Sequence, residues 1–136
     1  MDSDNPGFIC GILNNVDISS TAGIKSIVDT SDIELNRGNW TATSSRITCG
    51  SGQDGLYYIA IDVRMDSAVQ RIAPMLLFKR NGSSITEYAA TDYIRYASGH
   101  SNSSLHQEII CSLANTDYIE FYFNNDGLSG VAQNRS

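Results

Sequence analysis

The chain has 136 residues, of which 41% are hydrophobic and 18% are charged, and its formal net charge is −6 at pH 7. This length predicts a single domain that buries a core of its own and needs no metal or disulfide to fold. Because the net charge is negative and no basic cluster or long apolar run occurs, we expect neither nucleic acid nor membrane as a partner.

The N-terminal residues MDSDNPG are acidic, whereas a secretion signal begins basic and continues apolar. We expect a soluble protein in which residues 1–7 form a short tether and residues 8–136 form the folded domain. The three cysteines, Cys10, Cys49 and Cys111, are too far apart for paired zinc-ligand spacing and cannot all be paired in disulfides. We therefore expect buried free thiols.

Short apolar or alternating segments recur along the chain between clusters of Gly, Asn, Asp and Ser, and no helical period is sustained. The segments expected to form strands are Gly7–Leu13, Ile24–Asp29, Ile33–Leu35, Ser45–Cys49, Gly55–Met65, Ala73–Lys79, Ser84–Ala90, Asp92–Ala97, Leu105–Leu113 and Asp117–Phe123. About ten short strands without a linker or a repeat predict an all-β, ten-stranded jelly-roll β-sandwich.

The longest of these segments is apolar on both faces for half its length. Its odd positions, from Tyr57 to Met65, form an unbroken apolar row that predicts the core face of a strand. On the other face Leu56, Tyr58 and Ala60 are apolar, and only then do Asp62 and Arg64 introduce charge. Another surface should therefore cover the first half of the outer face.

Two later segments carry clear strand patterns. Asn81-Gly82 separates the predicted strands Ala73–Lys79 and Ser84–Ala90 and is the residue pair best suited to the positive φ angles of a two-residue hairpin turn. In DYIEFYF, Ile119, Phe121 and Phe123 alternate with Tyr118, Glu120 and Tyr122, so the outer face is again unusually aromatic.

The motifs of common enzymes are missing. Gly50, Gly52 and Gly55 match G-x-G-x-x-G, but they lead into a strand and not into a helix, so we interpret them as a turn. His100 and His106 are the only histidines, and no G-x-S-x-G motif is present. We expect no catalytic residues, no metal ligands and no cofactor, and hence a protein that is not an enzyme.

The order of several segments resembles the globular head of complement component 1q and its tumour necrosis factor relatives. The resemblance rests on the phenylalanine-led GFICGIL, on IVDT before NRGNW, on SRIT, on GLYYI, on MLLFKRNGSSI and on LHQEIICSLANTDYIEFYF. Together these cover most of Phe8 to Phe123. Two departures stand out: CGSGQD replaces a proline-containing link, and the chain stops at VAQNRS, where the last strand of the family should start. Either that strand is absent from this sequence or another segment fills its place.

The resemblance implies a homotrimer of jelly rolls that lean together around a three-fold axis. It places Leu56, Tyr58 and Ala60 against their copies. The other residues that it places near the axis are His106, Glu108 and Ile110 on one strand and Tyr118, Glu120 and Tyr122 on another. Three copies of His106 around the axis could bind a metal or respond to pH, although a singly hydrogen-bonded histidine is far more common. The alternative is that a loop or the N-terminal segment of the same subunit covers the apolar residues.

We interpret the chain as a non-enzymatic, homotrimeric virion structural protein, either a capsid decoration protein or the fibre-tip attachment domain of a virus or bacteriophage. Residues 1–7 would connect it to other virion proteins. The alternative is an extracellular recognition domain of the complement 1q type, which binds glycans or protein ligands such as those of a host surface through apical loops. Its candidate binding residues are Tyr93, Tyr96, His100 and Asn102.

Overall fold

The computed structural model describes residues 7–13, 24–25, 28–43, 45–67, 72–86, 89–95, 101–125 and 132–135. Every regular element in these ranges is a strand, which confirms the predicted all-β class. The strands are β1 (Phe8–Leu13), β2 (Ile24–Lys25), β3 (Val28–Arg37), β4 (Trp40–Thr43), β5 (Arg46–Cys49), β6 (Gly55–Ser67), β7 (Pro74–Arg80), β8 (Ser83–Ser84), β9 (Ala90–Thr91), β10 (Asn102–Leu113), β11 (Tyr118–Asn125) and β12 (Ala132–Arg135). In the described ranges no helix is long and apolar enough to cross a membrane.

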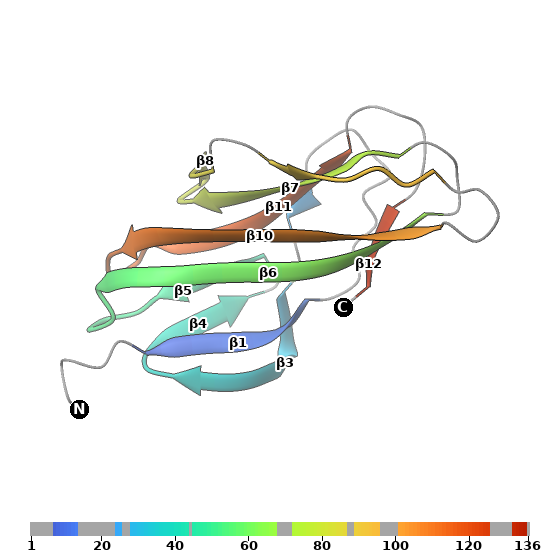
Figure 1. Ribbon diagram of the computed structural model, residues 1–136. Coiled ribbons are helices and arrows are strands. Elements are labelled where there is room, and N and C mark those ends of the chain that lie inside the picture. Colours follow the sequence, from blue (N-terminus) through green and yellow to red (C-terminus); the bar gives the residue numbers. More distant parts are fainter. Residues whose placement is uncertain are drawn as a thin grey trace.

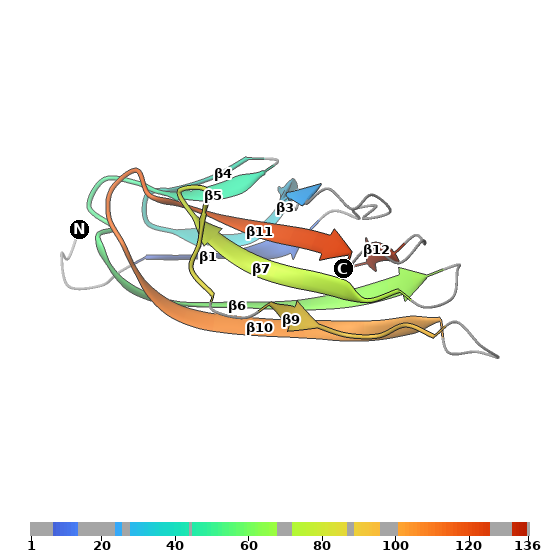
Figure 2. The same ribbon diagram turned by 90° about the horizontal axis from the view of Figure 1, so that it is seen from above.

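Two sheets face each other across a shared core. One sheet has the order β10-β6-β12, and the other has the order β4-β5-β11-β7-β8, with β2 on β11 and β9 on β7. Figure 2 shows β6 and β10 in one layer and β4, β5, β7 and β11 in the other. A separate pair, β1 and β3, closes one side of the sandwich next to β4 (Figure 1). This is the layered arrangement of a jelly roll.

The core lies between the inward faces of the two sheets. From the β10-β6 sheet it receives the odd residues Ile61, Val63 and Met65, as the alternation in the sequence predicts. The opposite sheet contributes Leu76, Phe78, Ile119, Phe121 and Phe123, and the rings of Phe78 and Phe121 meet edge to face at 5.4 Å. These large side chains exclude water from the centre of the sandwich.

The hairpin predicted at Asn81-Gly82 is confirmed. Asn81 and Gly82 have φ angles of 51° and 80°, and β7 pairs antiparallel with β8 across them. The turn is also fixed to its neighbour, because Asn81 Nδ2 donates to Asp117 Oδ1 at 2.6 Å and Tyr118 N donates to Asn81 Oδ1 at 3.0 Å. Positive φ at both turn positions matches the right-handed twist of the flanking strands.

Some strands differ from the expected ones. β4 was not predicted, because WTAT is short and its outward residues are small, yet Trp40 is buried. β3 is longer than the predicted Ile33–Leu35. The predicted strand Ser84–Ala90 contributes only the last residue of β8 and the first residue of β9. Of the cysteines, Cys49 is buried and Cys111 is half-buried, whereas Cys10 is exposed on β1, so the expectation of a buried thiol is wrong for Cys10. All three are free thiols.

Replacing a central core side chain tests the packing. Phe78 is completely buried, and Phe78→Ala should lower the free energy of unfolding by about 3–5 kcal/mol. Phe8→Ala makes the same chemical change at a ring that is 45% exposed and should cost less than about 2 kcal/mol. Urea unfolding at one fixed protein concentration measures both, and equal losses would contradict the placement of the core.

Candidate functional site

The outward side of the β6–β10 pair is the candidate site. The two strands pair antiparallel in one unbroken register from Gly55↔Leu113 to Asp66↔Asn102. Because side chains alternate along a strand, the even residues of both strands point away from the core. We call this surface the β6–β10 face, and it comprises Leu56, Tyr58, Ala60, Asp62, His106, Glu108 and Ile110.

One half of the β6–β10 face is apolar and exposed. Leu56 is 70% exposed, and Tyr58 and Ile110, which lie directly opposite each other, are each 64% exposed. Ala60 is exposed beside them. The structure thus brings together Leu56, Tyr58, Ala60 and Ile110, and no described part of the chain covers them. Large apolar side chains gathered at one exposed site indicate an interaction surface.

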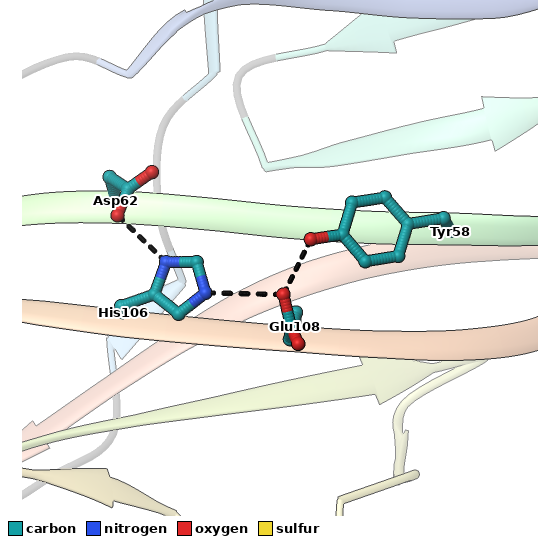
Figure 3. Close-up of polar contacts among 4 residues, drawn as sticks. All are labelled: Tyr58, Asp62, His106 and Glu108. Carbon is teal, nitrogen blue, oxygen red and sulfur yellow. Dashed lines mark hydrogen bonds and ion pairs between the residues drawn. The ribbon is translucent and has the colours of Figure 1, made fainter.

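The other half of the face holds a chain of polar contacts, drawn in Figure 3. His106 Nδ1 lies 2.7 Å from Asp62 Oδ1, and His106 Nε2 lies 3.3 Å from Glu108 Oε2. The same Glu108 oxygen accepts a hydrogen bond from the Tyr58 hydroxyl at 2.5 Å. We call these four residues the His106 cluster. It joins the apolar half to the polar half, because Tyr58 belongs to both.

The two carboxylates of the His106 cluster favour the protonated form of the imidazole. Hydrogen bonding to Asp62, and then to Glu108, raises the pKa of His106 above its ordinary value. The hydrogen bond from Tyr58, and then the contact with His106, lowers the pKa of Glu108. The stabilisation from the imidazolium is therefore present below the ordinary histidine pKa and is lost as the pH rises through the raised value. The stabilisation from ionised Glu108 is lost only as the pH falls through the lowered pKa of Glu108.

The contacts of His106 differ from those of a Ser–His or Cys–His pair. Both ring nitrogens of His106 contact carboxylates, and the nearby Tyr58 hydroxyl is bonded to Glu108, so no hydroxyl or thiol nucleophile of the described residues contacts the imidazole. Burial raises the pKa of the Cys49 thiol, which disfavours a reactive thiolate. Within the described ranges no group of three or more His, Cys, Asp or Glu side chains could hold a metal ion.

Two predicted interface residues lie elsewhere. Tyr118 and Tyr122 are on β11, which pairs with β5 and β7 in the opposite sheet and not with β10. Their outward side chains contact cations: Arg46 Cζ lies 4.5 Å from the Tyr118 ring, and Lys79 Nζ lies 3.6 Å from the Tyr122 ring. The expectation that they adjoin the β6–β10 face is corrected, because alternation predicts a side chain's face but not the sheet to which its strand belongs. Glu120, between them, is buried.

The predicted ligand-binding residues are described only in part. Tyr93 is 51% exposed, and Asn102 is exposed at the start of β10. Ser103 Oγ donates to Asp92 Oδ2, so the segment that carries Tyr93 is joined to the one that carries Asn102. Tyr96 and His100 lie outside the described residues.

Sequence reasoning identified the apolar half of the face but missed the His106 cluster. Asp62 and His106 are 44 residues apart in sequence, and only the β6–β10 register makes them direct neighbours. The alternation of charged residues at the end of the longest strand was the one available signal. That pattern alone does not identify which residue of a neighbouring strand lies opposite Asp62, because this depends on the β6–β10 register.

Comparison with known proteins supports the fold. No protein-family model matches the chain, and no curated protein matches its sequence. Solved structures do match: murine APRIL at pH 8.5 has a TM-score of 0.57 and 13% identity, with 93% of each chain covered. Murine APRIL at pH 8.0 has a TM-score of 0.56 and 10% identity, with 94% of this chain and 95% of that chain covered. The chain therefore has a jelly-roll fold of the tumour necrosis factor type.

The His106 contacts predict a titration that can be measured directly. NMR titration of the imidazole should give a His106 pKa above the ordinary histidine value, and Asp62→Asn should lower it more than Glu108→Gln does. Asp54→Asn removes a carboxylate before the start of β6 and should leave the pKa unchanged. An unaltered His106 pKa in Asp62→Asn would show that the cluster is not formed in solution.

Proposed function

We propose that the chain is a non-enzymatic structural module that assembles as a homotrimer through the β6–β10 face. The observation that carries the proposal is the exposure of Leu56, Tyr58 and Ile110 on one rigid, regularly paired surface. Burying such side chains against copies of themselves removes apolar area from water, the dominant favourable term in protein association. The resemblance to a family of homotrimeric jelly rolls supports three copies.

The polar half of the face supports the same assembly. With His106 protonated, the charges of Asp62, Glu108, His106 and Arg64 on this side of the pair balance, whereas a neutral imidazole leaves one excess negative charge on each copy. Repulsion between excess negative charges on three copies would oppose their close approach. The hydrogen bonds within the cluster reduce the cost of moving these groups out of water.

Within this class we propose a role as a particle component, either a decoration protein or an attachment domain, with the N-terminal residues as its link to neighbouring proteins. The support is compositional: a surface rich in Ser, Thr and Asn with few lysines, together with the absence of enzyme motifs. Detection of the chain by mass spectrometry in purified virus particles tests this role.

A substitution that introduces a charge at the centre of the apolar half of the β6–β10 face tests the assembly. Tyr58→Glu should convert a trimer into monomers at micromolar concentration, because three added carboxylates would meet in a dry interface beside Glu108. Tyr93→Glu makes the same change at a tyrosine that is 51% exposed outside the face and should leave the trimer intact. Sedimentation equilibrium measures both, and a soluble trimer of Tyr58→Glu, or a monomeric parent protein, would refute the proposal.

The recognition alternative has a narrower basis. The exposed Tyr93 ring, which could stack on a sugar, lies on a segment that is hydrogen-bonded to the one carrying the exposed Asn102. We expect no saturable binding when the purified protein is applied to a glycan array. Saturable binding that Tyr93→Ala abolishes would favour recognition over a purely structural role.

A further inference from the structure

The turn between β7 and β8 contains the one Asn-Gly pair of the sequence, Asn81-Gly82. In such a pair the backbone nitrogen of the glycine can attack the side-chain amide carbon of the asparagine, because glycine has no Cβ to hinder the approach. A bond forms between Gly82 N and Asn81 Cγ, the bond from Cγ to Nδ2 breaks, and the amine leaves as ammonia with the proton that Gly82 N gives up. Water then opens the succinimide ring and leaves aspartate or isoaspartate.

Hydrogen bonds, and not burial, restrain the Asn81 side chain. Asn81 is exposed, so water reaches it. Its Oδ1 accepts from Tyr118 N at 3.0 Å, and its Nδ2 donates to Asp117 Oδ1 at 2.6 Å. The backbone makes a third link, because Asn81 N donates to Tyr118 O at 3.0 Å. Both polar atoms of the amide are therefore held by the start of β11 and the residue before it.

The backbone of the closed turn also opposes the reaction. The φ angles of Asn81 and Gly82, 51° and 80°, match a type I′ turn. The succinimide ring can close only after rotation about the Cα–C bond of Asn81 brings the Gly82 nitrogen to eclipse Cβ. In a type I′ turn that nitrogen lies far from the eclipsed position. The reaction therefore requires the turn to open.

Asp117 is the residue on which this restraint depends. Its Oδ2 accepts from Ala114 N at 2.9 Å, and its backbone carbonyl accepts from Cys49 N at 2.8 Å, so its position is fixed independently of Asn81. The hydrogen bond from Ala114 N, and then that from Asn81, lowers the pKa of Asp117, so the carboxylate is ionised at neutral pH. A hydrogen bond to an ionised acceptor is stronger than one to a neutral acceptor.

Loss of the Asn81 amide would turn this attraction into repulsion. The Nδ2 donor would be replaced by a carboxylate oxygen facing Asp117 Oδ1, and two negative charges at hydrogen-bond distance repel each other. Isoaspartate would in addition lengthen the backbone of the turn by one carbon atom, which a two-residue hairpin turn does not accommodate.

We propose that Asn81 is a deamidation site, that the folded hairpin protects it through Asp117, and that deamidation releases the β7–β8 turn from β11. The reaction proceeds from the molecules in which the turn is locally open, so its rate follows the opening equilibrium. Asp117 is a positioning residue in this scheme, because it forms and breaks no covalent bond. The modification leaves a permanently altered turn, because the ammonia is lost to solution.

The test follows the conversion at residue 81 by peptide mapping and mass spectrometry while the full chain is incubated in mildly alkaline buffer. The folded chain should react at least about tenfold more slowly than the same chain in urea, since one hydrogen bond to an ionised group changes the opening equilibrium by about that factor. Asp117→Ala should remove most of this protection. Its matched control is Asp92→Ala, which also removes a carboxylate that accepts from a backbone amide and a side chain. The control should react like the parent chain.

Two further variants test the release of the turn. Asn81→Asp reproduces the aspartate product, and hydrogen exchange should show faster exchange of the Tyr118 amide. Combining Asn81→Asp with Asp117→Asn exchanges the donor and the acceptor, so the bond between the two side chains and the acceptor of Ala114 N can both be kept. In this double variant the exchange of the Tyr118 amide should return toward the parent rate.

Three results would overturn the proposal. The folded and the unfolded parent chain could react at the same rate. Asp117→Ala could react no faster than Asp92→Ala while the fluorescence of Trp40, the only tryptophan, still shows a buried indole. Finally, Asn81→Asp could leave the exchange of the Tyr118 amide unchanged. If Asp117→Ala does not fold, the first and third comparisons still decide. None of these measurements depends on trimer formation through the β6–β10 face, so the two proposals can fail separately.

Discussion

The uninterrupted pairing of β6 with β10 is the constraint from which the other features of this protein follow. Twelve consecutive residue pairs, without a bulge, keep every odd residue of β6 directed into the core and every even residue directed outward. A slip by one residue would exchange the two faces and place Asp62 and Arg64 where Ile61 and Val63 are buried. The cost of burying those charges fixes the register, and the register places His106 opposite Asp62 and Ile110 opposite Tyr58.

Much of the sandwich could be predicted from the sequence, because its strands alternate strongly and its turns use favoured residues. The alternating patterns of Tyr57 to Met65 and of Ile119 to Phe123 predict which side chains face the core. Asn81-Gly82 predicts the hairpin turn. The failures involve information that no local pattern contains. The pairing of strands that are far apart in sequence places Tyr118 and Tyr122 on the other sheet and brings His106 into contact with Asp62. Trp40 was missed because a four-residue strand gives too short a pattern.

A small polar network joins the starts of β1 and β6. Gln53 is buried; its side-chain oxygen accepts from Gly7 N at 2.7 Å, and its backbone carbonyl accepts from the Tyr57 hydroxyl at 2.5 Å. These bonds join the start of β1 to the start of β6 without a ladder between the two strands. Gly7 itself has no room for a side chain, because an added Cβ would lie 1.9 Å from the Arg37 carbonyl oxygen. The spacing of the two strands is thus set by this contact.

The turn at Asn81 also bears on how the protein can be produced. Asn81-Gly82-Ser83 is an acceptor sequence for N-linked glycosylation, and the nitrogen that would carry the sugar is the one that donates to Asp117 at 2.6 Å. A glycan added before the hairpin closes would place a bulky group against the carboxylate that also accepts from Ala114 N. Material from a eukaryotic secretory pathway would therefore carry an altered β7–β8 turn, whereas material from a bacterial cytoplasm retains the native one.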